Sequence, residues 1–243
     1  MGLPAGLGLN RPAGDPLWAS VVLLTDMRSP NGTTFTDAKG HALTAAGAVA
    51  ISGGEAVFPG STADMLTTPD SNDWNFGNEF CIELFGVRIP SLPGATAALL
   101  SHWNAFTPFA NNRSWALWLD ADGQLRFALS TNGQSGGIGV WTSGSTITAG
   151  TYDLRFERWN DAGTLRGNFY VNGSRLGSQQ VMAGTVFNAT GSLAIGTDNP
   201  NATTASNRNP FTGGMKVVRL TNAARNPGAA SYQVPTLPLP TSA

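Results

Sequence analysis

Paired carboxylates on one strand are the first feature of this chain that could do chemistry. Asp153 and Glu157 lie four residues apart in a segment of alternating apolar and polar residues, so both would project from one face of a β-strand. Retaining glycoside hydrolysis needs two carboxyl groups about 5–5.5 Å apart. Arg155 lies between them, however, and a solvated ladder of ion pairs explains all three. Because Glu83 is the only other strand carboxylate and no Glu-x-Asp-x-x-Glu arrangement occurs, we predict no catalytic residues and no enzyme.

Residues that could form a nucleophile or a metal site are few. His41 and His102 are the two histidines, and neither flanks a Gly-x-Ser-x-Gly nucleophile motif. No His or Cys cluster suggests zinc. Cys81 is the single cysteine and its neighbours are apolar, so we expect a buried thiol. Asp198 has the oxygen chemistry for Ca²⁺, but hard cations want several carboxylates and residues 197–210 contain only this one. An Asx turn explains Asp198 better, so we expect no cofactor and keep calcium at Asp198 as the alternative.

Glycan recognition would draw on the seven tryptophans, because aromatic faces stack on the C–H surfaces of sugars. Alternation along a strand places Trp115 on the core side and Trp118 on the opposite side. Trp159 shares the polar side of its strand with Arg155. The aromatic candidates for ligand binding are Trp103, Trp118, Trp141 and Trp159. Core or subunit packing is the open alternative for each of them.

A long polar loop over residues 197–210 is the second candidate for binding. It carries no large apolar side chain, which is unusual within a compact domain unless the loop has a function. Its candidate ligand-binding residues are Asp198, Asn199, Asn201, Asn207 and Arg208. A loop without a ligand is the alternative.

The elements that must position these residues are short strands. Charged residues make up only 12% of the chain, while Gly, Ser, Thr, Asn and Pro are abundant, which favours turns and strands over amphipathic helices. Turn sequences at residues 120–123, 160–163 and 171–174 favour tight antiparallel hairpins. Strands are predicted over residues 18–25, 48–51, 56–58, 80–89, 97–102, 114–119, 125–130, 152–159, 165–171, 192–195 and 215–221. The sequence therefore predicts an all-β fold of two stacked antiparallel sheets.

Charge and terminal composition limit the partners and define three segments. The net charge is −1 and no basic run occurs, so we expect no nucleic-acid partner. The N-terminus lacks a charged n-region and a continuous apolar core, and no stretch approaches a membrane span, so we expect neither a secreted precursor nor membrane insertion. Residues 1–16 and 234–243 are rich in proline and are predicted to be extended arms flanking a sandwich over residues 17–233.

Ordered motifs over about residues 18–225 resemble one family. The segment 74–83, Trp-Asn-Phe-Gly-Asn-Glu-Phe-Cys-Ile-Glu, is similar to that family's entry into a long central strand. Residues 167–173, Gly-Asn-Phe-Tyr-Val-Asn-Gly, match its later hairpin. The ending, Leu-Ala-Ile-Gly at 193–196 followed by Phe-Thr-Gly-Gly-Met-Lys-Val-Val-Arg-Leu-Thr-Asn-Ala-Ala-Arg at 211–225, is the best match. The chain thus resembles the laminin G-like, concanavalin A-like lectin and glucanase superfamily, which implies a jelly-roll sandwich.

Copies of this domain with that ending and a short proline-rich tail resemble those in tailed-bacteriophage virion proteins. The resemblance implies a non-catalytic structural or adhesion component of the virion, in the tail, a fibre or a head decoration, that could bind host-surface glycans. It also implies other virion proteins and copies of the chain itself as partners. A glycoside hydrolase or polysaccharide lyase, and a free soluble lectin, remain the alternatives.

Overall fold

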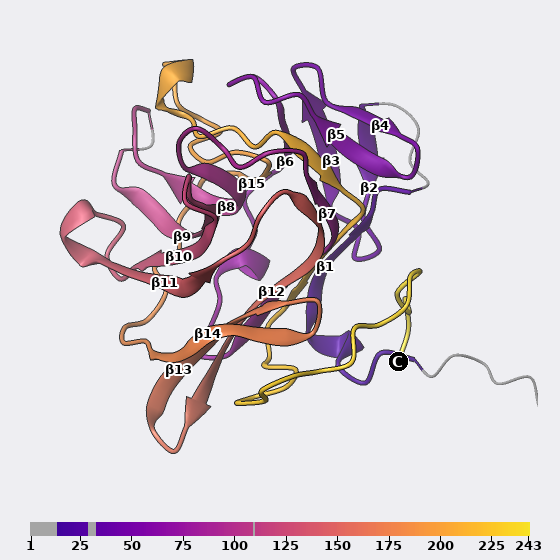
Figure 1. Ribbon diagram of the computed structural model, residues 1–243. Helices are drawn as coiled ribbons and strands as arrows, with labels where there is room; N and C mark the ends of the chain where they lie inside the picture. Colours follow the sequence, from indigo (N-terminus) through magenta and orange to yellow (C-terminus); the bar gives the residue numbers. More distant parts are fainter. Residues whose placement is uncertain (1–13, 29–32, 109) are drawn as a thin grey trace, which may run out of the picture.

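The computed structural model describes residues 14–28, 33–108 and 110–243, and it consists of two antiparallel sheets packed face to face (Figure 1). The nine-stranded sheet contains β1 (Val21–Asp26), β4 (Ala50–Ser52), β5 (Glu55–Phe58), β7 (Phe80–Ile89), β12 (Gly150–Asp161), β13 (Thr164–Val171), β14 (Ser174–Val181), β16 (Gly213–Met215) and β17 (Val217–Thr221). The eight-stranded sheet contains β2 (Thr34–Thr36), β3 (Ala42–Ala46), β6 (Met65–Thr68), β8 (Ala97–Asn104), β9 (Asn112–Leu119), β10 (Gln124–Ser130), β11 (Ile138–Thr146) and β15 (Leu193–Ile195). Short 3-10 helices connect some strands: η1 (Trp18–Ser20), η2 (Asn72–Trp74), η3 (Ser135–Gly137) and η4 (Ala205–Asn207).

The strand order confirms the predicted jelly-roll sandwich. The nine-stranded sheet runs β14-β13-β12-β7-β16-β5-β4, and β17 pairs with both β7 and β1. The eight-stranded sheet runs β11-β10-β9-β8-β15-β6-β3-β2. Six strands were not predicted as separate elements, namely β2, β3, β6, β11, β14 and β16, the last of which shares only Met215 with the predicted strand over residues 215–221. Of these, β11, β14 and β2 lie at sheet edges, where half-exposed positions weaken the alternation that identifies a strand.

The three predicted hairpins form, and their turns use the expected backbone. Asn172 and Gly173 have φ of 49° and 81° between β13 and β14, and Ala162 and Gly163 have φ of 48° and 92° between β12 and β13. Both central residues therefore occupy the left-handed region, as a type I′ hairpin requires. Gly123 between β9 and β10 has φ of 86°. The turn at Gly123 fixes the register of β9 and β10, which carry part of the candidate site.

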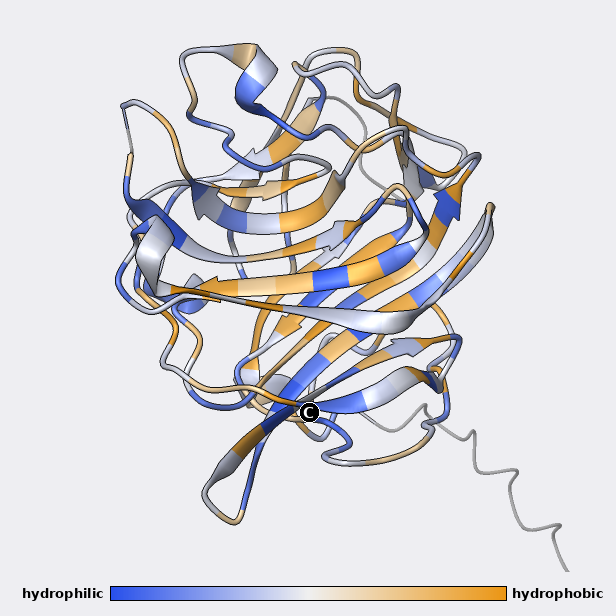
Figure 2. Ribbon diagram, turned by 60° about the vertical axis from the view of Figure 1, so that its left-hand side comes forward, coloured by the Kyte–Doolittle hydropathy of each residue, from blue (hydrophilic) through white to orange (hydrophobic). Residues whose placement is uncertain are grey.

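The core lies between the sheets and is rich in aromatic rings. Phe127 on β10 stacks on Phe156 on β12 with ring centroids 4.0 Å apart, so this pair joins the two sheets. Trp115 is fully buried in the same cluster, as predicted. Each such ring contributes about 1.5–3 kcal/mol of hydrophobic stabilisation. Orange and blue segments alternate along many strands in Figure 2, which is the period-two pattern of strands with one buried face.

The C-terminal segment lies along the outer face of the nine-stranded sheet, where it appears yellow in Figure 1. Leu239 is only 5% exposed and packs with Leu24, Phe85 and Val217. The backbone N–H of Asp15 donates to the carbonyl of Ser242 at 2.8 Å. Residues 234–243 are therefore packed onto this chain. Most of the predicted N-terminal arm, residues 1–13, lies outside the described residues, and the proposed domain boundaries stay a prediction.

The described part of the chain contains no helix with the length and apolar character to cross a bilayer.

Candidate functional site

A small hollow lies on the outer face of the eight-stranded sheet, next to three alanines. Ala98, Ala116 and Ala128 lie on β8, β9 and β10, and Ala116 faces Ala128 directly across the strand pair. They form a small cluster with Trp103 and Trp118 that is separate from the main core. The hollow has a volume of about 180 Å³ and is lined by Trp103, Trp118, Arg126, Ala128, Ile138 and Val140. The lining thus combines the small side chain of Ala128 with the larger side chains around it.

Two of the predicted aromatic residues form one wall of this hollow. The rings of Trp103 and Trp118 meet edge to face, with centroids 5.4 Å apart and planes at 81°. Such a pair is rigid, because each ring restricts the rotation of the other. The prediction that Trp118 points away from the core face that holds Trp115 is confirmed. Only 6% of Trp118 and 7% of Trp103 is exposed, so each ring offers an edge to a ligand and not a whole face.

Arg126 supplies the charge in the hollow. Its guanidinium carbon lies 5.0 Å from the centroid of the Trp118 ring, within the range of a cation–π interaction. Its Nη2 donates to Oγ1 of Thr96 at 3.0 Å and lies 3.0 Å from Oδ1 of Asp120. Arg126 was not predicted from the sequence. The signal was available, because Leu125, Phe127 and Leu129 alternate inward and so place Arg126 and Ala128 on the outer face with Trp118.

Asp198, predicted to bind a ligand, instead anchors the loop to the sheet. Oδ2 of Asp198 accepts from Nε1 of Trp118 at 3.0 Å and from Nδ2 of Asn209 at 2.7 Å. Oδ1 accepts from Nδ2 of Asn199 and from the backbone N–H of Asn209, both at 3.0 Å. Burial raises the pKa of this carboxyl, although the four donors act in the opposite direction. The loop of residues 197–210 is therefore joined to the hollow through Trp118.

The other predicted loop residues also make contacts within the protein. Asn199 accepts from the backbone N–H of Ala105 at 2.6 Å through Oδ1 and donates to the carbonyl of Asn207 at 3.0 Å through Nδ2. Asn201 accepts from the backbone N–H of Ser192. Arg208 donates to three backbone carbonyls, those of Thr62, Pro200 and Ala202, at 3.0–3.1 Å. These contacts hold the base of the loop in place, while residues 203–206 at its tip are exposed.

Calcium at Asp198 stays an untested prediction, and the geometry weighs against it. Both carboxylate oxygens accept two hydrogen bonds each, whereas Ca²⁺ takes six to eight oxygen ligands and would have to displace these donors. Among the described residues, no group of three or more His, Cys, Asp or Glu side chains could hold a metal ion.

Trp141 and Trp159 lie away from the hollow. Trp141 on β11 is half-buried against the main core and donates from Nε1 to the carbonyl of Val181 on β14 at 2.9 Å. It links the two sheets at their neighbouring edges. Trp159 on β12 is 4% exposed and lies on the outer face of the other sheet, beneath Gly228. Of the four predicted tryptophans, the structure brings together Trp103 and Trp118.

The predicted solvated ladder on β12 is wrong. Arg155 is 3% exposed and Glu157 is fully buried, because residues after β17 cover this face of the sheet. Nη2 of Arg155 donates to Oε1 of Glu83 at 2.6 Å, and its guanidinium lies 3.3 Å from the ring centroid of Tyr232. The sequence could not show this covering, because it comes from a segment about 70 residues away, as the contact of Glu157 with the backbone N–H of Asn226 shows.

This buried cluster contains three arginines and three carboxylates. Glu83 lies at its centre and also bonds Arg219, from Nε to Oε2 at 2.5 Å. Asp15 bridges Arg219 and Arg225, at 3.0 and 2.8 Å. Burial alone would raise the pKa of Glu83, but the charges of Arg155 and Arg219 outweigh burial and hold that pKa below its ordinary value. The charges of the cluster are paired with one another, which favours a structural role, while Oε2 of Glu157 is buried without a hydrogen-bond partner among the described residues.

Both histidines contact backbone carbonyls within the protein. His102 is fully buried, and its Nε2 lies 2.9 Å from the carbonyl of Gly191. Burial lowers its pKa to about 4, so the ring is neutral at physiological pH. His41 lies 3.0 Å from the carbonyl of Val22 through Nε2. Neither ring lines the hollow.

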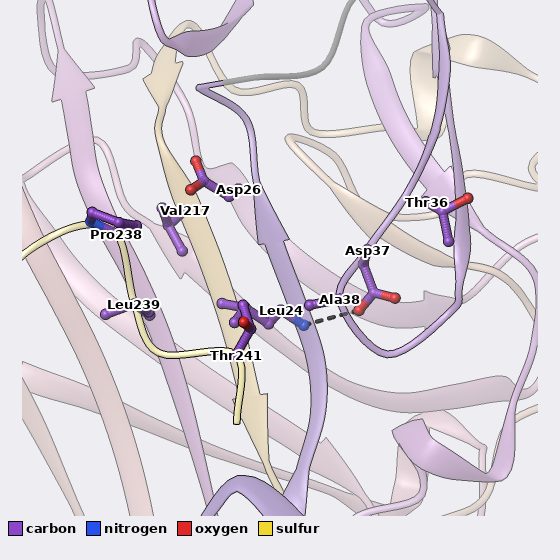
Figure 3. Close-up of a pocket in the computed structure, with 9 residues that line it drawn as sticks. All are labelled: Leu24, Asp26, Thr36, Asp37, Ala38, Val217, Pro238, Leu239 and Thr241. Carbon is purple, nitrogen blue, oxygen red and sulfur yellow. Dashed lines mark hydrogen bonds between the residues drawn. The ribbon is translucent and has the colours of Figure 1, made fainter. Parts of the chain in front are cut away.

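A second cavity, of about 290 Å³, lies between β1 and the C-terminal segment (Figure 3). Leu24, Val217 and Leu239 form its apolar side. The carboxylate of Asp37 accepts from the backbone N–H of Leu24 at 2.9 Å and from two N–H groups of its own turn, so its oxygens are engaged. No aromatic residue is among the described residues that line this cavity. It is the seam along which residues 234–243 pack, and it lacks the aromatic side chains that line the hollow.

Comparison with known proteins agrees with this architecture. Residues 60–230 match the family described as the concanavalin A-like lectin/glucanases superfamily. The chain belongs to this superfamily. No curated protein sequence matches the chain.

Solved structures share the fold at low sequence identity. A trans-sialidase-active mutant of Trypanosoma rangeli sialidase is 18% identical, with a TM-score of 0.59 over 86% of this chain and 31% of that one. The same sialidase with 2,3-difluorosialic acid is 19% identical, with a TM-score of 0.59 over 93% and 34%. This chain therefore spans about a third of the length of the sialidase chains that it matches. Domain 4 of an extracellular arabinanase from Geobacillus stearothermophilus, 18% identical over 83% of this chain and 82% of its own, has a TM-score of 0.48, too low to support an inference.

Proposed function

We propose that this domain binds carbohydrate in the hollow of the eight-stranded sheet and does not cleave it. The observation that carries the proposal is the hollow itself, which the Trp103–Trp118 pair lines together with Arg126 and Ala128. Sugars are bound in proteins by aromatic and apolar walls together with a few charged or polar groups that fix orientation. The chain also belongs to a superfamily whose description names lectins and glucanases, which supports a carbohydrate ligand.

The distribution of carboxylates supports binding without cleavage. Glycoside hydrolysis needs an acid and a second carboxylate on opposite sides of the bond. The described lining of the hollow includes no carboxylate. Asp198 accepts four hydrogen bonds behind Trp118, and Glu83 and Glu157 are buried in the cluster on the other sheet. The alternative, a hydrolase or lyase, predicts release of new sugar ends from a polysaccharide, which a reducing-end assay measures.

A glycan array tests the binding function. We expect the wild-type protein to retain a defined set of glycans and Ala128→Leu, which fills part of the hollow, to lose them. Val181→Ala is the matched control, because Val181 is 62% exposed and does not line the hollow. Unchanged binding by the Leu variant, with its thermal midpoint retained, would place glycan recognition elsewhere on the molecule.

We propose further that the domain is displayed on a tailed-bacteriophage virion, with other virion proteins or copies of itself as partners and host-surface glycans as ligands. The motif order that ends in residues 211–225 supports this context. The packing of Asp15 beside Ser242 also supports it, because both lie on the sheet opposite the hollow, so attachment near them would leave the hollow facing outward. Mass spectrometry of purified particles tests the proposal, and a monomer absent from particles would favour a free lectin.

A further inference from the structure

Arg126 is the only charged residue among those that line the hollow. Its lining residues other than Arg126 are apolar or aromatic, namely Trp103, Trp118, Ala128, Ile138 and Val140. A sugar hydroxyl placed against such walls loses its hydrogen bonds to water and gains none. A ligand that fits this hollow therefore concentrates its polar interaction at Arg126 and presents an apolar surface to the remaining walls.

The guanidinium of Arg126 has donors to spare. Nη2 is shared between Thr96 and Asp120, and Nε is buried, so neither faces a ligand freely. Nη1 makes no hydrogen bond to a described residue and is the donor left for a ligand. A charge-assisted hydrogen bond from a guanidinium to a carboxylate is stronger than one to a neutral hydroxyl.

The ion pair with Asp120 leaves this charge available. The two side chains are 29% and 20% exposed, so solvent screens their attraction. Oδ1 of Asp120 also accepts from Oγ1 of Thr96 at 2.8 Å, which holds the carboxylate in place. Asp120 does not line the hollow, so a ligand meets the cation before its counterion.

We infer that the hollow selects a sugar bearing a carboxylate over the neutral sugar of the same ring configuration, with Arg126 as the residue that distinguishes them. The inference rests on the proposed function and names its ligand class. The ring of an acidic sugar lies against the indole edges and Ala128, and its carboxylate reaches the guanidinium. The volume of about 180 Å³ admits one sugar ring at a time.

Matched sugar pairs provide the test. Methyl glucuronide, galacturonide and mannuronide each differ from the methyl glucoside, galactoside and mannoside by a carboxylate in place of a hydroxymethyl group. Isothermal titration of the full chain with all six, at pH 7 and low salt, measures the preference. We expect at least one uronide to bind at least tenfold more tightly than its neutral partner, and the preference to shrink as salt is added.

Two variants test whether Arg126 causes the preference for the uronide over the neutral sugar. Arg126→Gln should bring the uronide and its partner to equal affinity. Arg166→Gln is the control, because Arg166 forms a comparable surface pair with Asp161, 31% exposed, on the other sheet. Retention of the uronide preference in Arg126→Gln, or its loss in Arg166→Gln as well, would overturn the inference.

Failure of the inference is distinguishable from failure of the proposed function. Equal affinity for acid and neutral sugars in wild type, abolished by Ala128→Leu, would refute the carboxylate preference and leave carbohydrate binding at the hollow intact. Failure of all six sugars in titration and of every glycan on the array would refute both.

Discussion

Nε1 of Trp118 donates to Oδ2 of Asp198 at 3.0 Å, and this bond joins the wall of the hollow to a loop about 80 residues later in the chain. The indole therefore has its polar edge fixed on the loop side. Asp198 is 2% exposed and also accepts from Asn199 and Asn209, so its carboxylate bonds the base of the loop to the sheet. A wall that is already in place before binding reduces the conformational entropy that is lost when a ligand binds.

Asp198→Ala should destabilise the protein by about 3 kcal/mol, because it leaves buried donors of Trp118, Asn199 and Asn209 without an acceptor. Urea unfolding followed by tryptophan fluorescence measures the change. Asp122→Ala is the control, since Asp122 is exposed and bonds only within its own turn. Equal small effects of the two substitutions would contradict the anchoring role.

Asp15 should make stability depend on acidic pH. Burial acts to raise the pKa of its carboxyl, but the bonds and charges of Arg225 and Arg219 outweigh it and lower that pKa below 3.8. A carboxyl whose pKa is lower in the folded state contributes stability above its unfolded pKa and loses that contribution as pH falls through the folded value. We expect the unfolding free energy to drop below pH 3.8, and Asp15→Asn to remove part of this drop.

The comparison that checks this prediction is the difference between wild type and Asp15→Asn in denaturant unfolding from pH 7 to pH 2. The difference should be constant above pH 5 and shrink in the acid range. Asp161→Asn, in an exposed pair with Arg166, serves as the control. A difference that grows towards acid pH would have the wrong sign.

Cys81 should be unreactive in the folded protein. The thiol is fully buried, and burial together with the nearby charge of Glu83 raises its pKa well above the ordinary value. Because the thiolate is the reactive form, a disulfide reagent at pH 8 should label Cys81 only after unfolding. Rapid labelling of native protein would mean that the outer face of the sheet opens readily.

Leu239→Ala should cost about 2 kcal/mol of stability, at the lower end for buried leucines because the segment that carries it can adjust. Leu239 packs against Val21, Leu24, Phe85 and Val217, so its loss leaves a void on the nine-stranded sheet. Thermal unfolding of Leu239→Ala beside Thr236→Ala, an exposed position of the same segment, measures the difference. No difference would mean that residues 234–243 behave as a free arm.

Local patterns were sufficient for much of the fold. Strand alternation placed Trp115 and Trp118 on opposite faces, and Asn172 and Gly173 marked a hairpin because few other residues adopt positive φ. These features depend on neighbours within a few residues. The edge strand β14 escaped detection because it has few buried positions to mark a period.

Features that depend on distant segments could not be predicted. The burial of Arg155 and Glu157 comes from residues beyond 221, which cover a face that alternation alone describes as polar. Asp198 resembled a ligand-binding residue because the donors that occupy it, Trp118 and Asn209, belong to another strand and to the far end of the loop. Sequence spacing identifies the side chain but not its partners.

The pairing of β1 with β17 has a consequence for how the chain folds during synthesis. β1 leaves the ribosome long before its partner strand, because Val21 pairs with Thr221 and the strands between them are made first. Leu23 and Leu24 remain without that partner while the intervening residues are made, and contacts of such long range slow folding. We therefore expect nascent chains that stop before Val217 to depend on chaperones, and emergence of β17 to be the event that completes the pairing of β1.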